Sequence, residues 1–491
     1  MLLHLPPIRS LLLGTALLLT GNGLMSTLVA LRGSIEGFSD QTLGLMGSIY
    51  FVGFLVGTWT TPKLIRRIGH IRAFTFFASS LAAMILLHSL LLHPVVWMVL
   101  RLITGIALVG FYTIIESWLN SRSAPETRGQ VFAAYMVVNM AALAGAQQLL
   151  HVAAPDGFEL FTIAAIMVCL SVLPLASTRQ PQPEIHRVPR LKLSAMWRAA
   201  PMAVVACVVS GLSIGTFWSL GPLYATRLGY DASGVAMLMT VIIVGGALLQ
   251  VPLGRLSDRY DRRYALALAA GGAAIGAGLM AVSSNLPNSL LAASFLFGGM
   301  AFALYPISIA HLIDHLTHEQ ILSGNAGMLF LHSVGAIIGP SVAGTLMVPL
   351  GAPALPLFFA AALLPLVFII ALNIHRQQVD YIVEDPAEFV AMIRTAPTAV
   401  EMVAAVEEHR LETVHQAEQE AAHAPQDSSP DAEAEADAPE PAPTDEAGDA
   451  PPQPTAEAPE SAPDSSAGDL GSDETADKSP ENAPNTPQNR S

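Results

Sequence analysis

Long apolar runs recur along the first 374 residues of the chain, and short polar stretches separate them. A helix of about twenty apolar residues, rising about 1.5 Å per residue, is long enough to cross the hydrocarbon core of a bilayer. The pattern therefore predicts an all-α membrane protein with twelve transmembrane helices. The predicted helices cover residues 9–31, 41–61, 72–92, 95–118, 129–150, 158–178, 199–222, 232–253, 264–283, 289–312, 324–348 and 353–374.

The first run is interpreted as a retained membrane helix rather than a secretory peptide. A single basic residue, Arg9, precedes it, and no convincing small-residue cleavage site follows it.

Basic residues in the predicted loops sort to one side of the membrane. Seventeen lysines and arginines fall on one side, and only Arg32 and Arg227 fall on the other. Cytoplasmic loops of membrane proteins carry the excess of lysine and arginine. We therefore expect both termini of the chain in the cytoplasm.

A weak internal repeat relates the two halves of the apolar region. At an offset of 193 residues, Tyr112 corresponds to Tyr305 and Asn139 corresponds to His332. Secondary transporters are commonly built from such repeats, with the substrate site between them near the middle of the membrane.

Composition divides the chain further. Residues up to 374 carry a net charge of +7, whereas those from 375 onward carry −22. The alanine-, proline- and acid-rich end buries too little apolar surface to offset chain entropy, which predicts disorder. The predicted segments are an N-terminal six-helix bundle (1–178), a proline-containing cytoplasmic linker (179–198), a C-terminal six-helix bundle (199–374), a cytoplasmic juxtamembrane segment able to form a helix (375–423) and a disordered acidic tail (424–491).

The most charged stretch between two predicted helices is GRLSDRYDRR, from Gly254 to Arg263. A degraded copy, from Pro62 to His70, occupies the equivalent place in the first half, with Arg66 in place of the expected aspartate. The pattern GxLxDRx(G/D)RR between two transmembrane helices resembles the signature loop of the major facilitator superfamily. The stretches IIESWL, RGQVFAAYMVV, GPLYATRLG, FALYPISIA and GAIIGPSVAGTLM resemble the YcaD-like inner-membrane transporters, a bacterial branch of that superfamily.

This resemblance runs over residues 10–374 and implies the major facilitator fold, with twelve helices in two pseudo-symmetric six-helix bundles. It further implies alternating access, transport of a small organic solute and a place in the bacterial inner (cytoplasmic) membrane. It supplies no substrate. In the family, the signature loop is a cytoplasmic latch that holds one conformation. The latch role carries over to Gly254, Asp258, Arg259, Arg262 and Arg263.

Polar residues inside the predicted helices are the candidates for binding substrate or protons. Polar groups are costly in hydrocarbon and should therefore face protein or a water-filled cavity. Arg101 lies about 9 Å below the helix boundary. It either binds an anionic group or tunes a proton site, as the family's RxxxG motif implies, or it anchors the helix end by snorkelling. Asn22 and Tyr305 are further candidates.

Glu116 and the pair Asn139 and His332 each leave two alternatives open. Glu116 is either a proton-coupling carboxylate or a boundary charge that pairs with an arginine of the 122–128 loop. His332 either binds substrate or a proton, or is satisfied by an interhelical hydrogen bond. Its repeat counterpart Asn139 lies at a similar predicted depth.

A cluster of acidic and histidine side chains ends the helix 289–312. Its spacing allows a metal site, but we interpret it as a solvated loop without metal. The cluster comprises His311, Asp314, His315 and His318.

These features favour a secondary active or facilitative transporter, with proton coupling left open. No phosphate loop, nucleophile elbow or metal motif occurs, so we predict neither an enzyme nor a cofactor. The expected partners are a small-molecule substrate and membrane lipid but no nucleic acid, and we expect a monomer. The alternative is a non-transporting membrane sensor or scaffold that binds a cytoplasmic partner through its acidic tail.

Overall fold

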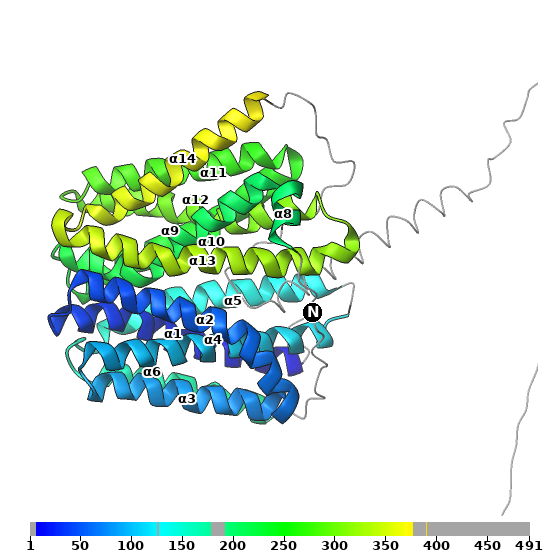
Figure 1. The fold of residues 1–491 in the computed structure, drawn as a ribbon. Helices are drawn as coiled ribbons and strands as arrows, with labels where there is room; N and C mark the ends of the chain where they lie inside the picture. The colour runs from blue at the N-terminus through cyan, green and yellow to red at the C-terminus, as the bar shows by residue number, and fades with distance from the viewer. Residues whose placement is uncertain (1–5, 125–126, 178–191, 377–388, 390–491) are drawn as a thin grey trace, which may run out of the picture. The chain divides into compact units, whose positions relative to one another are not determined.

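The computed structural model describes residues 6–124, 127–177, 192–376 and 389, all within one unit of the chain, residues 1–424. This part of the chain is built from helices joined by short turns and contains no strand (Figure 1). Twelve of its helical stretches are long and apolar enough to cross a membrane, which confirms the twelve predicted spans.

The helices fall into an N-terminal and a C-terminal half. The N-terminal half comprises α1 (Pro6–Ile35), α2 (Asp40–Ile68), α3 (His70–Leu90), α4 (Pro94–Arg122), α5 (Arg128–Gln148) with its extension η3 (Leu149–His151), and α6 (Glu159–Leu170) with α7 (Val172–Ala176), which together form the sixth span. The C-terminal half comprises α8 (Leu193–Ala199), α9 (Pro201–Arg227), α10 (Ala232–Arg259), α11 (Arg262–Val282), α12 (Pro287–Ile313), α13 (His318–Leu350) and α14 (Ala354–Arg376).

Several helix ends lie beyond the predicted apolar runs, and two of the differences concern charged segments. The charged stretch 254–263 is almost entirely helical, because α10 continues to Arg259 and α11 begins at Arg262. Basic residues in the last turn are favourable there, since the C-terminal end of a helix carries a partial negative charge. The end of the predicted linker 179–198 forms the short helix α8, whereas residues 178–191 lie outside the described part, as do nearly all of the predicted segments 375–423 and 424–491.

The two halves repeat the same helix pairings. In the N-terminal half α2 packs on α4, α1 on α5 and α3 on α6, and the equivalent pairs in the C-terminal half are α10 on α12, α9 on α13 and α11 on α14. Figure 1 shows the two sets as separate groups, blue to cyan and green to yellow.

Equivalent glycines bring the equivalent helices together. A Cβ atom at Gly105 would collide with the carbonyl oxygen of Tyr50, and one at Gly298 would collide with that of Ile242. The repeat read from the sequence is therefore present in the packing of the backbone.

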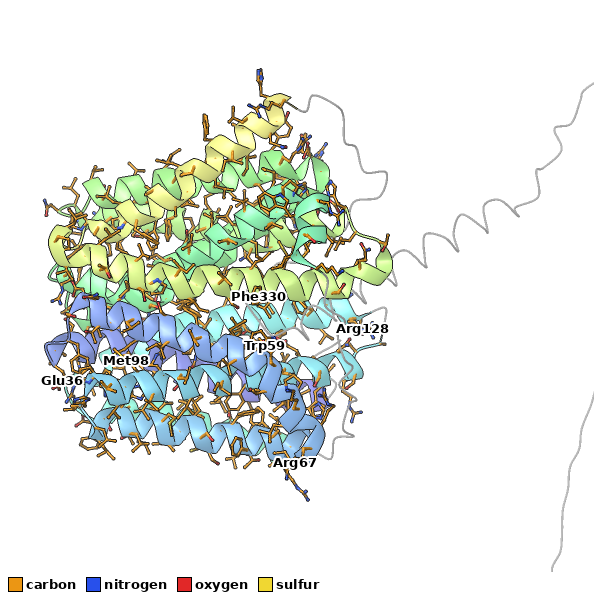
Figure 2. The ribbon with its side chains drawn as sticks, viewed as in Figure 1. Glu36, Trp59, Arg67, Met98, Arg128 and Phe330 are labelled. Atoms are coloured by element: carbon orange, nitrogen blue, oxygen red, sulfur yellow. The ribbon has the colours of Figure 1, made fainter. Side chains whose placement is uncertain are left out.

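All twelve spans run between two ends of the bundle. One end holds the start of α1, the α10–α11 turn and the end of α14, and we call it the basic end. The other holds the α1–α2 and α9–α10 turns, and we call it the Asp40 end. Figure 2 shows Arg67 and Arg128 toward the basic end and Glu36 at the opposite one.

The halves meet chiefly where α2 packs on α13, with further contacts of α5 with α10 and of α1 and α2 with α9. Toward the Asp40 end the α2–α13 contact is a backbone contact. A Cβ atom at Gly44 would collide with the carbonyl oxygen of Pro340 and lie 3.1 Å from the Cα atom of Gly344. A side chain there would separate the halves.

Candidate functional site

Glu116 lies inside the N-terminal half, bound to a neighbouring helix. Its side chain is fully buried on α4, and the Tyr135 hydroxyl of α5 donates a hydrogen bond to its Oε1 at 3.1 Å. Asn139, one turn beyond Tyr135, donates to the Tyr135 carbonyl oxygen at 2.9 Å. Among the described residues its buried Oδ1 finds no hydrogen-bond partner. A carboxylate, a phenol and an amide acceptor are thus gathered at the α4–α5 contact.

Arg101 occupies a separate position on the same helix. Fifteen residues separate it from Glu116, or about 22 Å along α4, so the two side chains do not form one site. Its guanidinium carbon lies 4.2 Å from the centroid of the Tyr50 ring on α2, which is a cation–π contact. The side chain is buried, and its Nε has no hydrogen-bond partner in the described part of the chain. The Arg101 guanidinium therefore lies between α4 and α2.

In the C-terminal half, Tyr305 of α12 and His332 of α13 are in contact. Their ring centroids lie 4.6 Å apart, and both side chains are buried. The repeat places this pair where the N-terminal half has Tyr112 and Asn139. The structure therefore brings two predicted site residues together, as an aromatic and imidazole pair.

Asn22 and Asn325 are further buried amides. Asn22 lies on α1 and Asn325 on α13. Neither amide atom of Asn325 has a hydrogen-bond partner among the described residues. Buried polar atoms are normally satisfied by protein or water, so an amide of this kind is suited to a polar ligand.

The predicted latch residues divide into buried and exposed groups. Arg262 is 3% exposed at its side chain and forms ion pairs with Asp258 on α10, at 3.2 Å, and with Asp314 directly after α12. Arg263 also donates to Asn373 of α14, at 3.4 Å. Arg259, in contrast, is exposed. The buried arginines tie helices of the C-terminal half to one another.

Asp261 begins α11 and is held by Arg263. Its Oδ1 accepts the Arg263 backbone N–H at 2.9 Å, and its Oδ2 accepts from the guanidinium at 2.6 Å. Partial burial alone would raise the pKa of Asp261, but the hydrogen bonds and charge of Arg263 outweigh it and lower that pKa below its usual value.

The cluster at the end of α12 is not the solvated loop that we expected. His311 is buried, the Asp314 side chain is only 4% exposed, and the Asp314 carboxylate pairs with Arg262. The sequence pattern missed this because the partner of Asp314 lies 52 residues earlier in the chain.

His70, in the degraded first copy of the signature loop, is also buried. Its Nε2 lies 2.9 Å from the Ser117 hydroxyl of α4. The second copy of the signature loop forms ion pairs. The first copy instead forms a histidine–hydroxyl contact between α3 and α4, and its Arg66 and Arg67 are exposed.

Several side-chain contacts between described residues of the two halves lie toward the Asp40 end. Arg227, at the end of α9, donates to Asp40 Oδ1 at 2.6 Å. Nearby, the Ser341 and Ser48 hydroxyls are 2.7 Å apart. Where α5 and η3 pack on α10, Gln148 donates to Thr240 at 2.7 Å and His151 lies 3.0 Å from the Ser233 hydroxyl. None of these pairs was predicted from the sequence.

This geometry defines a class of protein: a multi-pass membrane protein of two repeated six-helix halves, with buried polar groups inside each half. The sequence profile of the Major Facilitator Superfamily matches residues 11–246 and 203–397 of the chain. The chain belongs to that superfamily, and it is a membrane transporter for a small-molecule substrate.

Relatives cover most of the apolar region. An uncharacterized MFS-type transporter of Enterobacter sp. (strain 638) is 30% identical over 344 residues, which are 70% of this chain and 89% of the relative. The uncharacterized MFS-type transporter YcaD of Escherichia coli O7:K1 is 29% identical over 343 residues, with the same coverage of 70% and 89%. These matches confirm the resemblance to the YcaD-like group.

Solved structures share the fold at low sequence identity. The nucleoside transporter NupG superposes with a TM-score of 0.63 at 14% identity, covering 74% of this chain and 98% of NupG. An inward-facing bacterial homolog of the human lysosomal transporter Spinster gives 0.55 at 15% identity, with 83% and 98% covered. The human organic anion transporter MFSD10 gives 0.53 at 17% identity, with 74% and 99% covered. They support the twelve-helix fold.

Proposed function

We propose that this chain is a secondary transporter that moves a small organic solute by alternating access. The observation that supports it best is the set of contacts that join the halves toward the Asp40 end. The backbone contact at Gly44 and the ion pair of Asp40 with Arg227 hold the halves together toward the Asp40 end. The conformation is therefore one with the Asp40 end closed, and rocking of the halves would exchange it for one with the basic end closed.

The proposal extends to orientation and domain boundaries. The excess of basic residues supports a cytoplasmic basic end, with both termini in the cytoplasm of a bacterium. The moving units are residues 1–178 and 199–374, joined by the linker 179–198. On this assignment the conformation is open to the cytoplasm.

We assign substrate binding to buried polar residues of the two halves. Arg101 supplies a cation, whereas Asn22, Asn325 and the Tyr305 and His332 pair supply neutral polar and aromatic surface. Such a set suits a neutral or anionic solute that carries hydrogen-bonding groups.

Glu116 is the candidate for proton coupling. A carboxylate that accepts a hydrogen bond from a tyrosine can take up or release a proton when that contact changes with the conformation. Proton coupling therefore rests on the Glu116 contact with Tyr135.

A ligand screen followed by transport tests this function. Purified protein is heated with nucleosides and with small organic anions, since the similar folds NupG and MFSD10 are named for these classes. Solutes that raise the melting temperature are then tested for uptake into proteoliposomes. We expect saturable uptake that Arg101→Ala and His332→Ala reduce by about ten-fold or more. Binding without uptake in either direction would reject the transporter assignment.

Two further experiments test proton coupling and the scaffold alternative separately. Uptake that ignores an imposed pH gradient would reject a coupling role for Glu116. Removal of residues 398–491 should leave uptake intact, whereas a scaffold acting through its tail would lose its cellular phenotype.

A further inference from the structure

Phe389, thirteen residues beyond the end of α14, contacts the last turns of α10. Its backbone N–H donates a hydrogen bond to Asp258 Oδ1 at 2.9 Å. Its half-buried ring covers Gly254, where an added Cβ atom would collide with the ring carbons. The contact thus combines a backbone hydrogen bond to Asp258 with packing of an aromatic ring against Gly254. Both Gly254 and Asp258 are latch residues predicted from the sequence.

We propose that Phe389 acts as an intramolecular strap: it docks on Gly254 and Asp258 and stabilises the conformation with the basic end open. This inference rests on the alternating-access function proposed above, and it adds a regulatory contact that the signature loop itself does not contain.

Packing of the Phe389 ring against α10 requires glycine at position 254. Every larger residue would place atoms where the Phe389 ring lies. Asp258 adds a hydrogen bond to this contact. Its Oδ1 accepts both from the Arg262 guanidinium and from the Phe389 backbone N–H. The carboxylate is therefore engaged by its own half and by the strap.

The strap has a short distance to cover. Arg263 at the start of α11 donates to Asn373 in the last turn of α14, so α14 ends beside the α10–α11 turn. Thirteen residues can span up to about 45 Å, which is ample. Docking of a tethered residue is an intramolecular event with an effective concentration on the order of millimolar, so a modest contact suffices.

Occupancy by Phe389 has a conformational consequence. α10 is one of the helices that pack across the boundary, against α5. While the ring covers Gly254 and the strap holds Asp258, no residue of the other half can occupy those positions. Closure of the basic end through the latch residues therefore requires Phe389 to leave.

Photo-cross-linking tests the contact itself. A benzoylphenylalanine at position 389 of the full-length chain in membranes should cross-link within residues 250–263. Cross-links confined to other peptides, or none at all, would overturn the docking. This readout does not depend on transport, so it can fail or succeed independently of the proposed function.

Spin-label distances test the consequence. Labels at Lys63→Cys and Gln320→Cys report the basic end in a Cys169→Ser, Cys207→Ala background, because positions 63 and 320 are exposed. Phe389→Ala should raise the population with the basic end closed by at least about three-fold. Phe368→Ala, which removes an exposed ring from the neighbouring α14, should leave the distances unchanged.

A second variant keeps the test independent of the first. Gly254→Ala should expel the ring and shift the population in the same direction as Phe389→Ala. The double variant should then resemble Phe389→Ala, because both changes remove one contact. An unaltered distance distribution in Phe389→Ala, or full additivity in the double variant, would overturn the strap.

Discussion

The buried Arg262 guanidinium joins Asp258 of α10 to Asp314, which directly follows α12. Arg262→Ala removes the ion-pair partner that Asp258 and Asp314 share. Breaking a buried ion pair by removing one partner typically costs about 3–5 kcal/mol. We expect a marked fall in the apparent melting temperature of the purified protein.

The matched control for this prediction is Arg259→Ala. Arg259 belongs to the same signature stretch but is exposed, so its removal should change stability by less than about 0.5 kcal/mol. Equal effects of the two substitutions would contradict the buried network.

The ionisation of Asp261 makes the stability of the protein depend on pH. Its pKa is lowered below 3.8 because the hydrogen bonds and charge of Arg263 outweigh partial burial. A lowered carboxyl pKa adds stability at pH values above 3.8, and that stability is lost as the pH falls through the lowered value. The difference in melting temperature between the native protein and Asp261→Asn should be constant near neutrality and shrink toward zero under acid conditions. A difference that grew on acidification would contradict the lowered pKa of Asp261.

At the residue scale, the sequence predicted which polar side chains are buried better than it predicted their partners. Arg101, Glu116, Asn139 and His332 are all buried, as expected for polar groups within apolar runs. Their partners could not be predicted, because hydrogen bonds such as that of Tyr135 with Glu116 depend on how two helices are rotated against each other. A hydrophobic pattern specifies a buried face only coarsely.

At the scale of elements, the contact between α2 and α13 depends on Gly44. A Cβ atom there would collide with the Pro340 carbonyl oxygen, and overpacking of this kind typically costs about 1–3 kcal/mol. We expect Gly44→Ala to disfavour the conformation with the Asp40 end closed. Labels at Ile35→Cys and Leu286→Cys, both exposed, should then report longer distances across that end.

Gly145→Ala is the control for the element-scale prediction. Gly145 lies on α5 with no atom within 4 Å of its added Cβ. Alanine should be neutral there or should stabilise the helix by about 0.5–1 kcal/mol. Identical distance changes in the two variants would show that helix propensity, rather than the contact with Pro340, is responsible.

The existence of the helices was predictable, but their ends were less so. Each span was found because a long apolar run has few alternatives in a membrane. The ends were misplaced at 254–263, where α10 extends through charged residues to Arg259. Backbone hydrogen bonding continues a helix beyond the hydrocarbon, so the apolar run marks the membrane and not the helix.

At the scale of the whole molecule, the repeat and the family were readable from motifs, whereas the conformation was not. Asp40 follows the helix-capping Ser39, and an acid in a first turn is explained by the helix dipole alone. Its partner Arg227 lies 187 residues away in the other half. A sequence compatible with two conformations cannot indicate which contacts are made in one of them, so the pairing needs the structure.

The pair of Asp40 with Arg227 should act as a switch on the equilibrium between the two conformations. Its side chains are 11% and 38% exposed, so solvent screens the pair and its expected contribution is only about 0.2–1 kcal/mol. Asp40→Asn or Arg227→Gln should therefore lower the ratio of the conformation with the Asp40 end closed to the one with it open by about 1.4- to 5-fold, measured with labels at Ile35→Cys and Leu286→Cys.

Charge reversal separates this effect from a general disturbance. The double variant Asp40→Arg, Arg227→Asp should restore part of the closed population that each single reversal loses. Glu36→Gln is the matched control, because Glu36 pairs with Arg32 within α1 and its immediate extension rather than across the halves. Raising the salt concentration should weaken closure in the native protein but not in Asp40→Asn, since only the native protein has the ion pair to screen. If Glu36→Gln opened the Asp40 end as far as Asp40→Asn does, the charge at this end would act through its overall field, and the pair would not be the contact that joins the halves.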